Sequence, residues 1–231
     1  MKLIRSILYL LLIFISSFIF YFELIRPSYL EYKVTHSDSY KSKIIFFNSL
    51  KFNNGCVFLI GDSILESLNF SGNKYVNLSI GGETTHTILK RLKLFSFPKN
   101  SSIVCMIGIN DLLFNKSLDE IKEDQNELLS HFCNNENISK IYLFGTLPIS
   151  INGFFFDLNE VNLSVLDLNN YSSLIPKIES HNFNKKIIYV DCYSLFSDTN
   201  NMLKAKYNFD GVHLNEMGKI ALKKNILNVT K

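Results

Sequence analysis

The sequence lacks the features expected of a nucleic-acid-binding protein or a metal-dependent enzyme. Its 231 residues carry a formal net charge of only +3, and the lysines and arginines are scattered, with no basic stripe interleaved with aromatic residues. The electrostatic signature of nucleic-acid binding is therefore missing, and that class of function is excluded. The five histidines show no ligand spacing such as H-E-x-x-H, so we expect no metal and no other cofactor.

Cysteine is also scarce, with four residues in the chain. Cys56 and Cys105 lie in predicted strands and Cys192 directly follows one, which suits small buried apolar groups better than zinc ligands. Disulfides are permitted if the domain lies outside the cytoplasm, but spacing alone names no pair. We expect free thiols.

The amino terminus is predicted to be an appendage to a single α/β domain, because 47% of the residues are hydrophobic, enough for one sizeable core. Lys2 and Arg5 precede an uncharged, mostly apolar stretch from Ser6 to Phe22, close to the lower limit of roughly 17 residues for a spanning helix. A secretory signal begins in the same way, but no A-x-A-like cleavage pattern follows. We therefore predict that residues 1–26 form an uncleaved transmembrane anchor, with a cleaved signal peptide as the alternative.

The charges around this stretch favour a cytoplasmic amino terminus and a domain outside the cytoplasm, although Arg26 and Lys33 nearly balance the charges before it. Residues 27–54 are predicted to connect the anchor to the domain, because Ser, Tyr and Lys alternate there without a long apolar period. The run from Lys43 to Phe47 fits a short helix or a short strand.

From residue 55 onward, short apolar runs alternate with stretches that have apolar residues at helical spacing, a pattern typical of βαβ units and a parallel sheet. The predicted strands are Cys56 to Ile60, Tyr75 to Asn77, Ile103 to Ile107, Ile141 to Phe144 and Ile187 to Val190. The predicted helices are Thr84 to Leu94, Leu118 to Phe132, part of Leu163 to Ser180, and Glu216 to Leu227. Right-handed crossovers then place helices on both faces of the sheet.

The motif Gly61-Asp62-Ser63 directly follows the first predicted strand. The Ser63 hydroxyl therefore stands at the carboxyl end of the sheet, where open α/β sheets place their sites. A serine nucleophile needs an imidazole within hydrogen-bond reach and a carboxylate that orients the imidazole. Asp210 and His213, three residues apart, fit these roles, although this pair taken alone is better explained by a surface aspartate and a loop histidine.

Two further motifs follow predicted strands. Asn110, in Gly108-Ile109-Asn110-Asp111, can donate a side-chain N–H to an oxyanion. The pair Gly81-Gly82 lets a backbone N–H approach the same oxygen, because glycine has no Cβ. Either motif alone would be explained by a turn or a helix cap, but the ordered set of four motifs indicates ester chemistry.

The four motifs, taken in this order, resemble those of the SGNH hydrolases, also called GDSL esterases and lipases. They are Gly-Asp-Ser, the glycine, G-x-N-D and D-x-x-H. The resemblance covers roughly residues 55–231 and implies an α/β fold, a flavodoxin-like three-layer α/β/α sandwich with a parallel sheet. It also implies roles for single residues: Ser63 as nucleophile and oxyanion-hole donor, Asp210 and His213 as its catalytic partners, and Gly82, rather than Gly81, with Asn110 as the other hole donors.

The resemblance implies a serine ester hydrolase that removes an acyl group from a glycan, a lipid or a small ester through an acyl-Ser63 intermediate. An O-acyltransferase with a sugar acceptor would use the same residues, and a non-catalytic envelope binding module would keep the fold. Hydrolysis is favoured because the chain has no multi-helix channel to deliver an acyl donor, and a binding module would be expected to lack a member of the site. The run Phe154-Phe155-Phe156 either lines an acyl pocket or anchors a loop.

Overall fold

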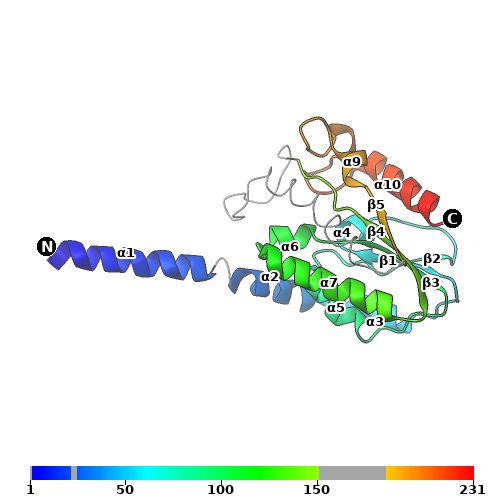
Figure 1. Ribbon diagram of the computed structural model, residues 1–231, viewed down its shortest axis with the longest axis horizontal. Helices are drawn as coiled ribbons and strands as arrows, with labels where there is room; N and C mark the ends of the chain where they lie inside the picture. The colour runs from blue at the N-terminus through cyan, green and yellow to red at the C-terminus, as the bar shows by residue number, and fades with distance from the viewer. Residues whose placement is uncertain (1, 22–24, 151–185) are drawn as a thin grey trace.

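A parallel β-sheet forms the centre of the molecule (Figure 1). The computed structural model describes residues 2–21, 25–150 and 186–231. The strands in this part of the chain are β1 (Val57–Gly61), β2 (Tyr75–Asn77), β3 (Ser101–Met106), β4 (Ile138–Phe144) and β5 (Ile187–Val190). Their order is β2-β1-β3-β4-β5, and every neighbouring pair is parallel. This is the strand order of flavodoxin-like folds, as the sequence predicted.

Helices cover both faces of the sheet, because successive side chains of a strand point to opposite faces. On one face, Phe58 and Ile60 of β1 pack in a cluster with residues of α3 (Asp38–Ser49), α5 (Thr85–Leu92) and α7 (Leu118–Asn134). On the other face, Val57 and Leu59 pack with residues of α4 (Ser63–Glu66), α6 (Ile109–Leu113), α9 (Tyr193–Phe196) and α10 (Glu216–Val229). The result is a helix, sheet and helix sandwich (Figure 1).

The predicted strands are all confirmed, with ends that differ by up to three residues. Three of the predicted helices correspond to α5, α7 and α10, and each begins after a side-chain cap. Ser117 and Glu120, for example, form a reciprocal capping box at the start of α7. The helix predicted within Leu163 to Ser180 lies outside the described residues.

The segment before the first strand is more ordered than the sequence indicated. It forms α2 (Arg26–Thr35), with proline in its first turn, and α3, which begins at a Ser37 cap. The run from Lys43 to Phe47 is thus helical, and Phe47 is buried in the core on one face of the sheet. A short 3-10 helix, η3 (Ala205–Tyr207), precedes the last loop.

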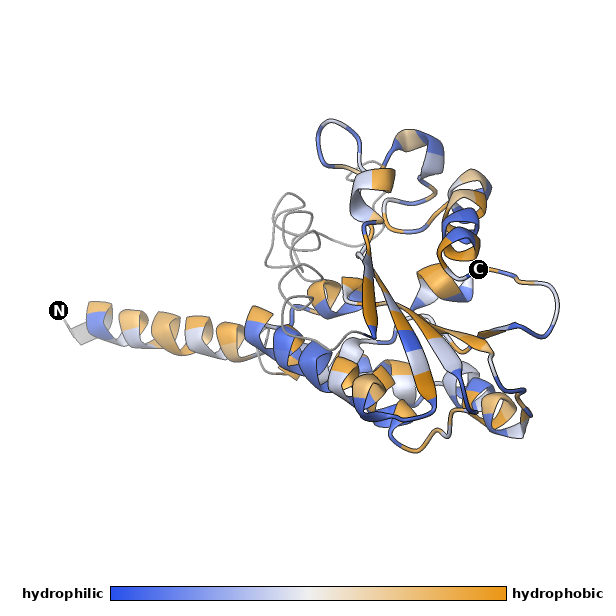
Figure 2. Cartoon of the chain, turned by 45° about the vertical axis from the view of Figure 1, so that its right-hand side comes forward, coloured by the Kyte–Doolittle hydropathy of each residue, from blue (hydrophilic) through white to orange (hydrophobic). Residues whose placement is uncertain are grey.

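The predicted transmembrane helix is not supported, because no helix within the described residues is long and apolar enough to cross a membrane. Helix α1 (Lys2–Phe20) has an uncharged part, from Ser6 to Phe20, that is shorter than the ~20 apolar residues typical of a span. Its side chains from Ile4 onward are exposed, and most of them are apolar (Figure 2).

Candidate active site

Ser63 lies immediately beyond the carboxyl end of β1, as the first residue of α4. The strand can end there only with glycine, since a Cβ on Gly61 would come within 2.3 Å of the Met106 carbonyl oxygen on the adjacent strand β3. Asp62 caps α4, and its Oδ1 accepts the Ile64 N–H at 2.9 Å. The site therefore lies at the carboxyl ends of the neighbouring strands β1 and β3, where the strand order reverses.

Ser63, His213 and Asp210 form one continuous chain of hydrogen bonds. Ser63 Oγ lies 2.9 Å from His213 Nε2, and His213 Nδ1 lies 2.6 Å from Asp210 Oδ2. Because Nδ1 faces a carboxylate, it holds the ring proton, and Nε2 is left to accept the Ser63 O–H. The structure thus brings together three predicted residues that are up to 150 positions apart in the chain.

Asp210 is held in place by the backbone of its own turn. Its Oδ1 accepts the His213 N–H at 2.7 Å and the Val212 N–H at 3.0 Å. Burial alone would raise the pKa of Asp210, but these hydrogen bonds and the one to the His213 ring outweigh burial and lower that pKa. The carboxylate is therefore charged at neutral pH and orients the imidazole.

The two glycines after β2 differ in their backbone contacts. The Gly81 N–H donates to Glu66 Oε2 at 2.8 Å, and the other oxygen of Glu66 is bound by Lys43. Gly82 has φ +82°, a backbone conformation that favours glycine. Because Glu66 already uses the Gly81 N–H, Gly82 is the better candidate for an oxyanion donor. The sequence did not single out Glu66, although it lies three residues after Ser63 on the same helix.

Asn110 lies on α6, directly beyond the carboxyl end of β3, and is buried. Its Nδ2 donates to the Glu83 backbone carbonyl at 2.9 Å, so the side chain is tied to the loop that carries Gly82. A primary amide has two N–H donors, and this bond occupies one of them. The second N–H can serve an oxyanion.

Asp62 is a buried carboxyl group directly beside Ser63. Its Oδ2 has no hydrogen-bond partner among the described residues, whereas its Oδ1 is bound by the Ile64 N–H. Burial raises the pKa of Asp62 to about 7, even though the Ile64 N–H and the nearby His213 favour the charged form. Asp62 thus shapes the turn at Ser63 from outside the hydrogen-bonded chain of Ser63, His213 and Asp210.

A mostly apolar cavity of about 390 Å³ lies beside His213. Its apolar walls include Ile64, Phe209 and Leu214, and the ion pair between Lys219 and Glu216 lies at its margin. Phe209 is 74% exposed, so this wall is open to solvent. A substrate group placed here would contact the same imidazole that faces Ser63. The run Phe154-Phe155-Phe156 lies outside the described residues.

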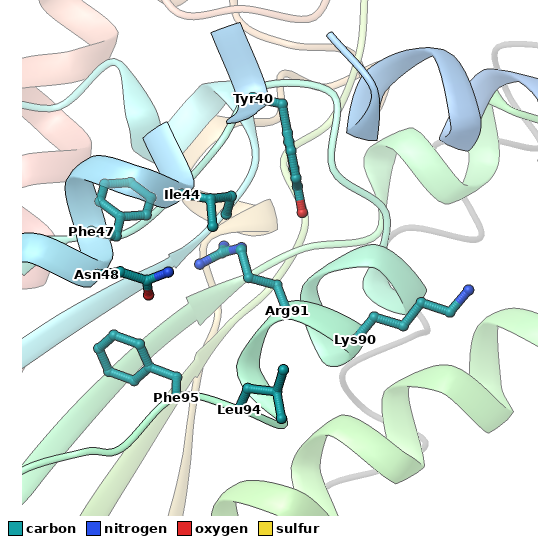
Figure 3. Close-up of a pocket in the computed structure, with 8 residues that line it drawn as sticks. All are labelled: Tyr40, Ile44, Phe47, Asn48, Lys90, Arg91, Leu94 and Phe95. Carbon is teal, nitrogen blue, oxygen red and sulfur yellow. The ribbon is translucent and has the colours of Figure 1, made fainter. Parts of the chain in front are cut away.

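A second cavity, of about 220 Å³, lies between α3 and α5 and contains none of the predicted site residues (Figure 3). Arg91 reaches across it from α5, whereas the Lys90 ammonium points away (Figure 3). The guanidinium binds both carboxylate oxygens of the fully buried Glu83, at 2.8 and 2.7 Å, and Tyr40 donates to the same carboxylate at 3.1 Å. Arg91 and Tyr40 at this cavity therefore hold the loop that carries Gly82 in place through the Glu83 carboxylate.

The four cysteines and His86 lie outside the hydrogen-bonded chain of Ser63, His213 and Asp210. All four cysteines are free thiols, as expected. Burial raises the pKa of both Cys105 and Cys192 to about 12, so these thiols are poor nucleophiles. His86 Nδ1 lies 3.1 Å from the Asp124 carboxylate, and His181 lies outside the described residues.

A family model for the GDSL-like Lipase/Acylhydrolase family matches residues 58–219. The chain belongs to this family. GDSL-like lipases and acylhydrolases cleave esters, so the protein is an ester-hydrolysing serine esterase, and the match contains every residue of the candidate site from Ser63 to His213. Helices α2 and α3 lie before the matched region.

Solved structures show the same fold. A GDSL-like lipase from Bacteroides thetaiotaomicron is 20% identical, with a TM-score of 0.67, and the match covers 83% of this chain and 96% of that chain. A candidate acylhydrolase from Bacteroides fragilis is 22% identical, with a TM-score of 0.65 and coverage of 82% and 94%. The OSK domain of Drosophila Oskar is 17% identical, with a TM-score of 0.57 and coverage of 84% and 97%. No curated protein matches this GDSL-like sequence.

Proposed function

We propose that the protein hydrolyses carboxylic esters through an acyl-Ser63 intermediate, with His213 as the proton carrier and Asp210 as the residue that orients it. The observation that carries the proposal is the hydrogen-bonded chain from Ser63 Oγ through the imidazole to the carboxylate. The geometry matches what a serine nucleophile requires, since each heavy-atom distance is within about 3 Å.

In the first half-reaction, Ser63 Oγ attacks the ester carbonyl carbon and its proton passes to His213 Nε2. The negative charge that develops on the carbonyl oxygen is stabilised by the N–H groups of Ser63 and Gly82 and by the second N–H of Asn110. The imidazolium is stabilised by the charged Asp210 and gives its proton to the leaving alkoxide oxygen. The products of this step are an alcohol and the acyl-Ser63 ester.

In the second half-reaction, water replaces the alcohol. His213 Nε2 takes a proton from the water as its oxygen attacks the acyl carbon, and the same donors hold the second oxyanion. Collapse breaks the bond to Ser63 Oγ, which recovers its proton from the imidazolium, and the carboxylic acid leaves. The His213 side chain is 38% exposed, which gives water access to this nitrogen.

The substrate is an acylated glycan, a lipid or a small ester, with one apolar group seated in the cavity beside His213. The volume of about 390 Å³ and the mostly apolar walls suit an acyl group better than a sugar. Phe209 and Ile64 at this cavity are therefore the side chains that we expect to set the acyl-chain preference.

The test is the turnover of a chromogenic ester series, from acetyl to long-chain acyl, by the full chain and its Ser63→Ala variant. Ser71→Ala, at an exposed serine outside the site, is the matched control. We expect serine-dependent turnover and covalent labelling of Ser63 by a fluorophosphonate, located by peptide mass spectrometry. A folded protein with neither turnover nor labelling would refute the proposal, and release that accelerates only with added sugars would favour the transferase.

The proposal includes attachment to a membrane through α1, with the esterase domain outside the cytoplasm. Its support is the exposed apolar surface of α1 and the positive charge of Lys2 and Arg5 before it. Fractionation of cells that express the full chain, compared with a Leu11→Asp and Phe14→Asp double variant, tests this. Attachment predicts loss of the protein from the membrane fraction only in the double variant.

A further inference from the structure

Helix α2, which lies before the region matched by the family model, packs directly on the loop that carries Gly82. A Cβ on Gly82 would lie 3.0 Å from Val34 Cγ2, so the Val34 side chain closes over this glycine. One turn earlier on α2, Glu31 Oε1 accepts the Thr84 hydroxyl proton at 2.5 Å. Thr84 is fully buried and caps α5, so Glu31 binds the point where the loop becomes a helix.

The same carboxylate also reaches the segment that carries Asn110. Glu31 Oε1 lies 2.8 Å from Lys116 Nζ, and this ammonium lies 3.6 Å from Asp111, the neighbour of Asn110 on α6. Asp124 of α7 lies 2.9 Å from the same ammonium. Burial disfavours the charged ammonium, but the surrounding carboxylates outweigh burial and raise the pKa of Lys116. Lys116 therefore stays charged and bridges α2 to α6.

The two donor-bearing segments are joined in two further ways. Asp111 Oδ2 accepts both the backbone N–H of Thr85, at 2.9 Å, and its hydroxyl, at 3.0 Å. Asn110 Nδ2 donates to the Glu83 carbonyl. Glu31 contacts both segments from outside them, through Thr84 on one side and Lys116 on the other.

We propose that Glu31 is a positioning residue of the oxyanion hole, which fixes the spacing between the Gly82 N–H and the Asn110 side chain. The inference rests on the proposed function and deepens it, because it makes α2 a working part of the esterase. Donors aimed at a developing charge act mainly in the transition state, and a small misplacement weakens them without changing substrate binding. Loss of Glu31 then lowers kcat and leaves KM nearly unchanged.

The test uses the full chain with Glu31→Ala and Glu31→Gln. Glutamine keeps an oxygen acceptor for the Thr84 hydroxyl but removes the charge that pairs with Lys116, and its similar shape protects folding. The matched control is Glu123→Gln, at an exposed glutamate that lines the same surface depression as Glu31. We expect kcat to fall about tenfold for Glu31→Ala and about threefold for Glu31→Gln, with KM within twofold of the starting protein and with Glu123→Gln unchanged.

A double-mutant cycle with Asn110→Ala separates positioning from a purely structural role. If Glu31 acts by positioning the oxyanion hole, Glu31→Ala lowers kcat by much less than tenfold in a protein that already carries Asn110→Ala. A purely structural role predicts that Glu31→Ala lowers kcat by the same factor with and without Asn110→Ala, and that result would overturn the inference. Glu31→Gln, if it kept full kcat, would overturn it as well.

Fluorophosphonate labelling of Ser63 in the starting protein distinguishes the two ways of failing. Labelling and turnover in the starting protein, with unchanged kcat in both Glu31 variants, would refute the role of Glu31 and leave the esterase proposal intact. The absence of labelling and turnover in the folded starting protein would refute the esterase proposal and the role of Glu31 together.

Discussion

The side-chain amide of Asn110 donates to the backbone carbonyl of Glu83 over 2.9 Å, and this bond joins two segments that follow different strands. Asn110 follows β3, whereas Glu83 follows Gly82 in the loop after β2. The bond fixes the amide plane, because one of the two Nδ2 hydrogens is committed to a buried acceptor. The orientation of the remaining N–H is thereby set before any substrate binds.

Asn110→Ala is expected to lower kcat by about 10²- to 10³-fold, the usual cost of losing one oxyanion donor. It also leaves the buried Glu83 carbonyl without this partner, so the free energy of unfolding falls by about 1–3 kcal/mol. Steady-state kinetics and urea denaturation measure the two effects separately. Asn228→Ala, at an exposed position on α10, is the control, and near-normal turnover of Asn110→Ala would exclude the residue from the hole.

Asp210→Asn is expected to lower kcat by an amount on the order of 10⁴-fold while the protein remains folded. An amide N–H facing His213 Nδ1 stabilises the tautomer whose proton is on Nε2, and that nitrogen can then no longer accept the Ser63 proton. In the starting protein the lowered pKa keeps Asp210 charged throughout an assay above about pH 4. A pH profile of both proteins measures this, with Asp119→Asn on the exposed start of α7 as the control. A drop of less than tenfold would show that the carboxylate is dispensable.

The central sheet and the hydrogen-bonded chain of Ser63, His213 and Asp210 could be predicted because each motif directly follows a strand or lies on one turn. Each strand is a short apolar run, and Ser63 and Asn110 directly follow such runs, so the parallel arrangement brings them to one edge. Asp210 and His213 are three residues apart and fold on one turn, where the carboxylate also accepts the backbone N–H of the histidine. The contact between Ser63 and His213, 150 positions apart, was expected only from the ordered set of motifs and its resemblance to the SGNH hydrolases.

The part played by α2 and α3 could not be predicted in the same way. Glu31 and Thr84 are 53 positions apart, and Tyr40 and Glu83 are 43 positions apart. Neither pair follows a repeating pattern, and α2 has few strongly apolar residues to mark a buried face. These contacts depend on how α2 and α3 pack against the folded domain, and the hydrophobic periodicity of the sequence does not encode that packing.

Gly82→Ala is expected to lower both stability and activity, and Gly72→Ala is its matched control. Both glycines have φ +82°, so alanine costs roughly 1–2 kcal/mol of stability at either position. Only at Gly82 does the new methyl group meet another side chain, Val34, at 3.0 Å, because nothing lies within 4 Å of a Cβ on Gly72. Thermal melts should therefore show a loss of stability for both variants, and kinetics should show a large loss of kcat only for Gly82→Ala. Equal kcat in the two variants would contradict a role for the Gly82 loop.

Asp62→Asn is expected to change how stability depends on pH. The pKa of this carboxyl rises from 3.8 to about 7 on folding because the group is buried. The folded protein therefore binds more protons than the unfolded chain between about pH 4 and pH 7, so stability falls as pH rises through this window. The shift corresponds to about 4 kcal/mol, fully present below about pH 4 and lost above about pH 7.

In Asp62→Asn this pH-dependent contribution is absent, because an amide does not titrate, whereas Oδ1 still accepts the Ile64 N–H. The buried carboxyls of Glu83 and Asp111 also have raised pKa values, but they are present in both proteins, so the difference mainly reports Asp62. Urea denaturation at several pH values from 4 to 8 measures that difference. We expect the stability of the variant relative to the starting protein to rise as pH rises to 7, and then to stay constant. The amide nitrogen takes the place of Oδ2, which has no partner among the described residues. Burying this nitrogen lowers the free energy of unfolding by the same amount at every pH. It therefore shifts the curve of stability difference against pH without changing its slope. Two parallel curves across this range would mean that Asp62 is ionised in the folded protein at pH 5, and that its turn beside Ser63 is better solvated than its burial indicates.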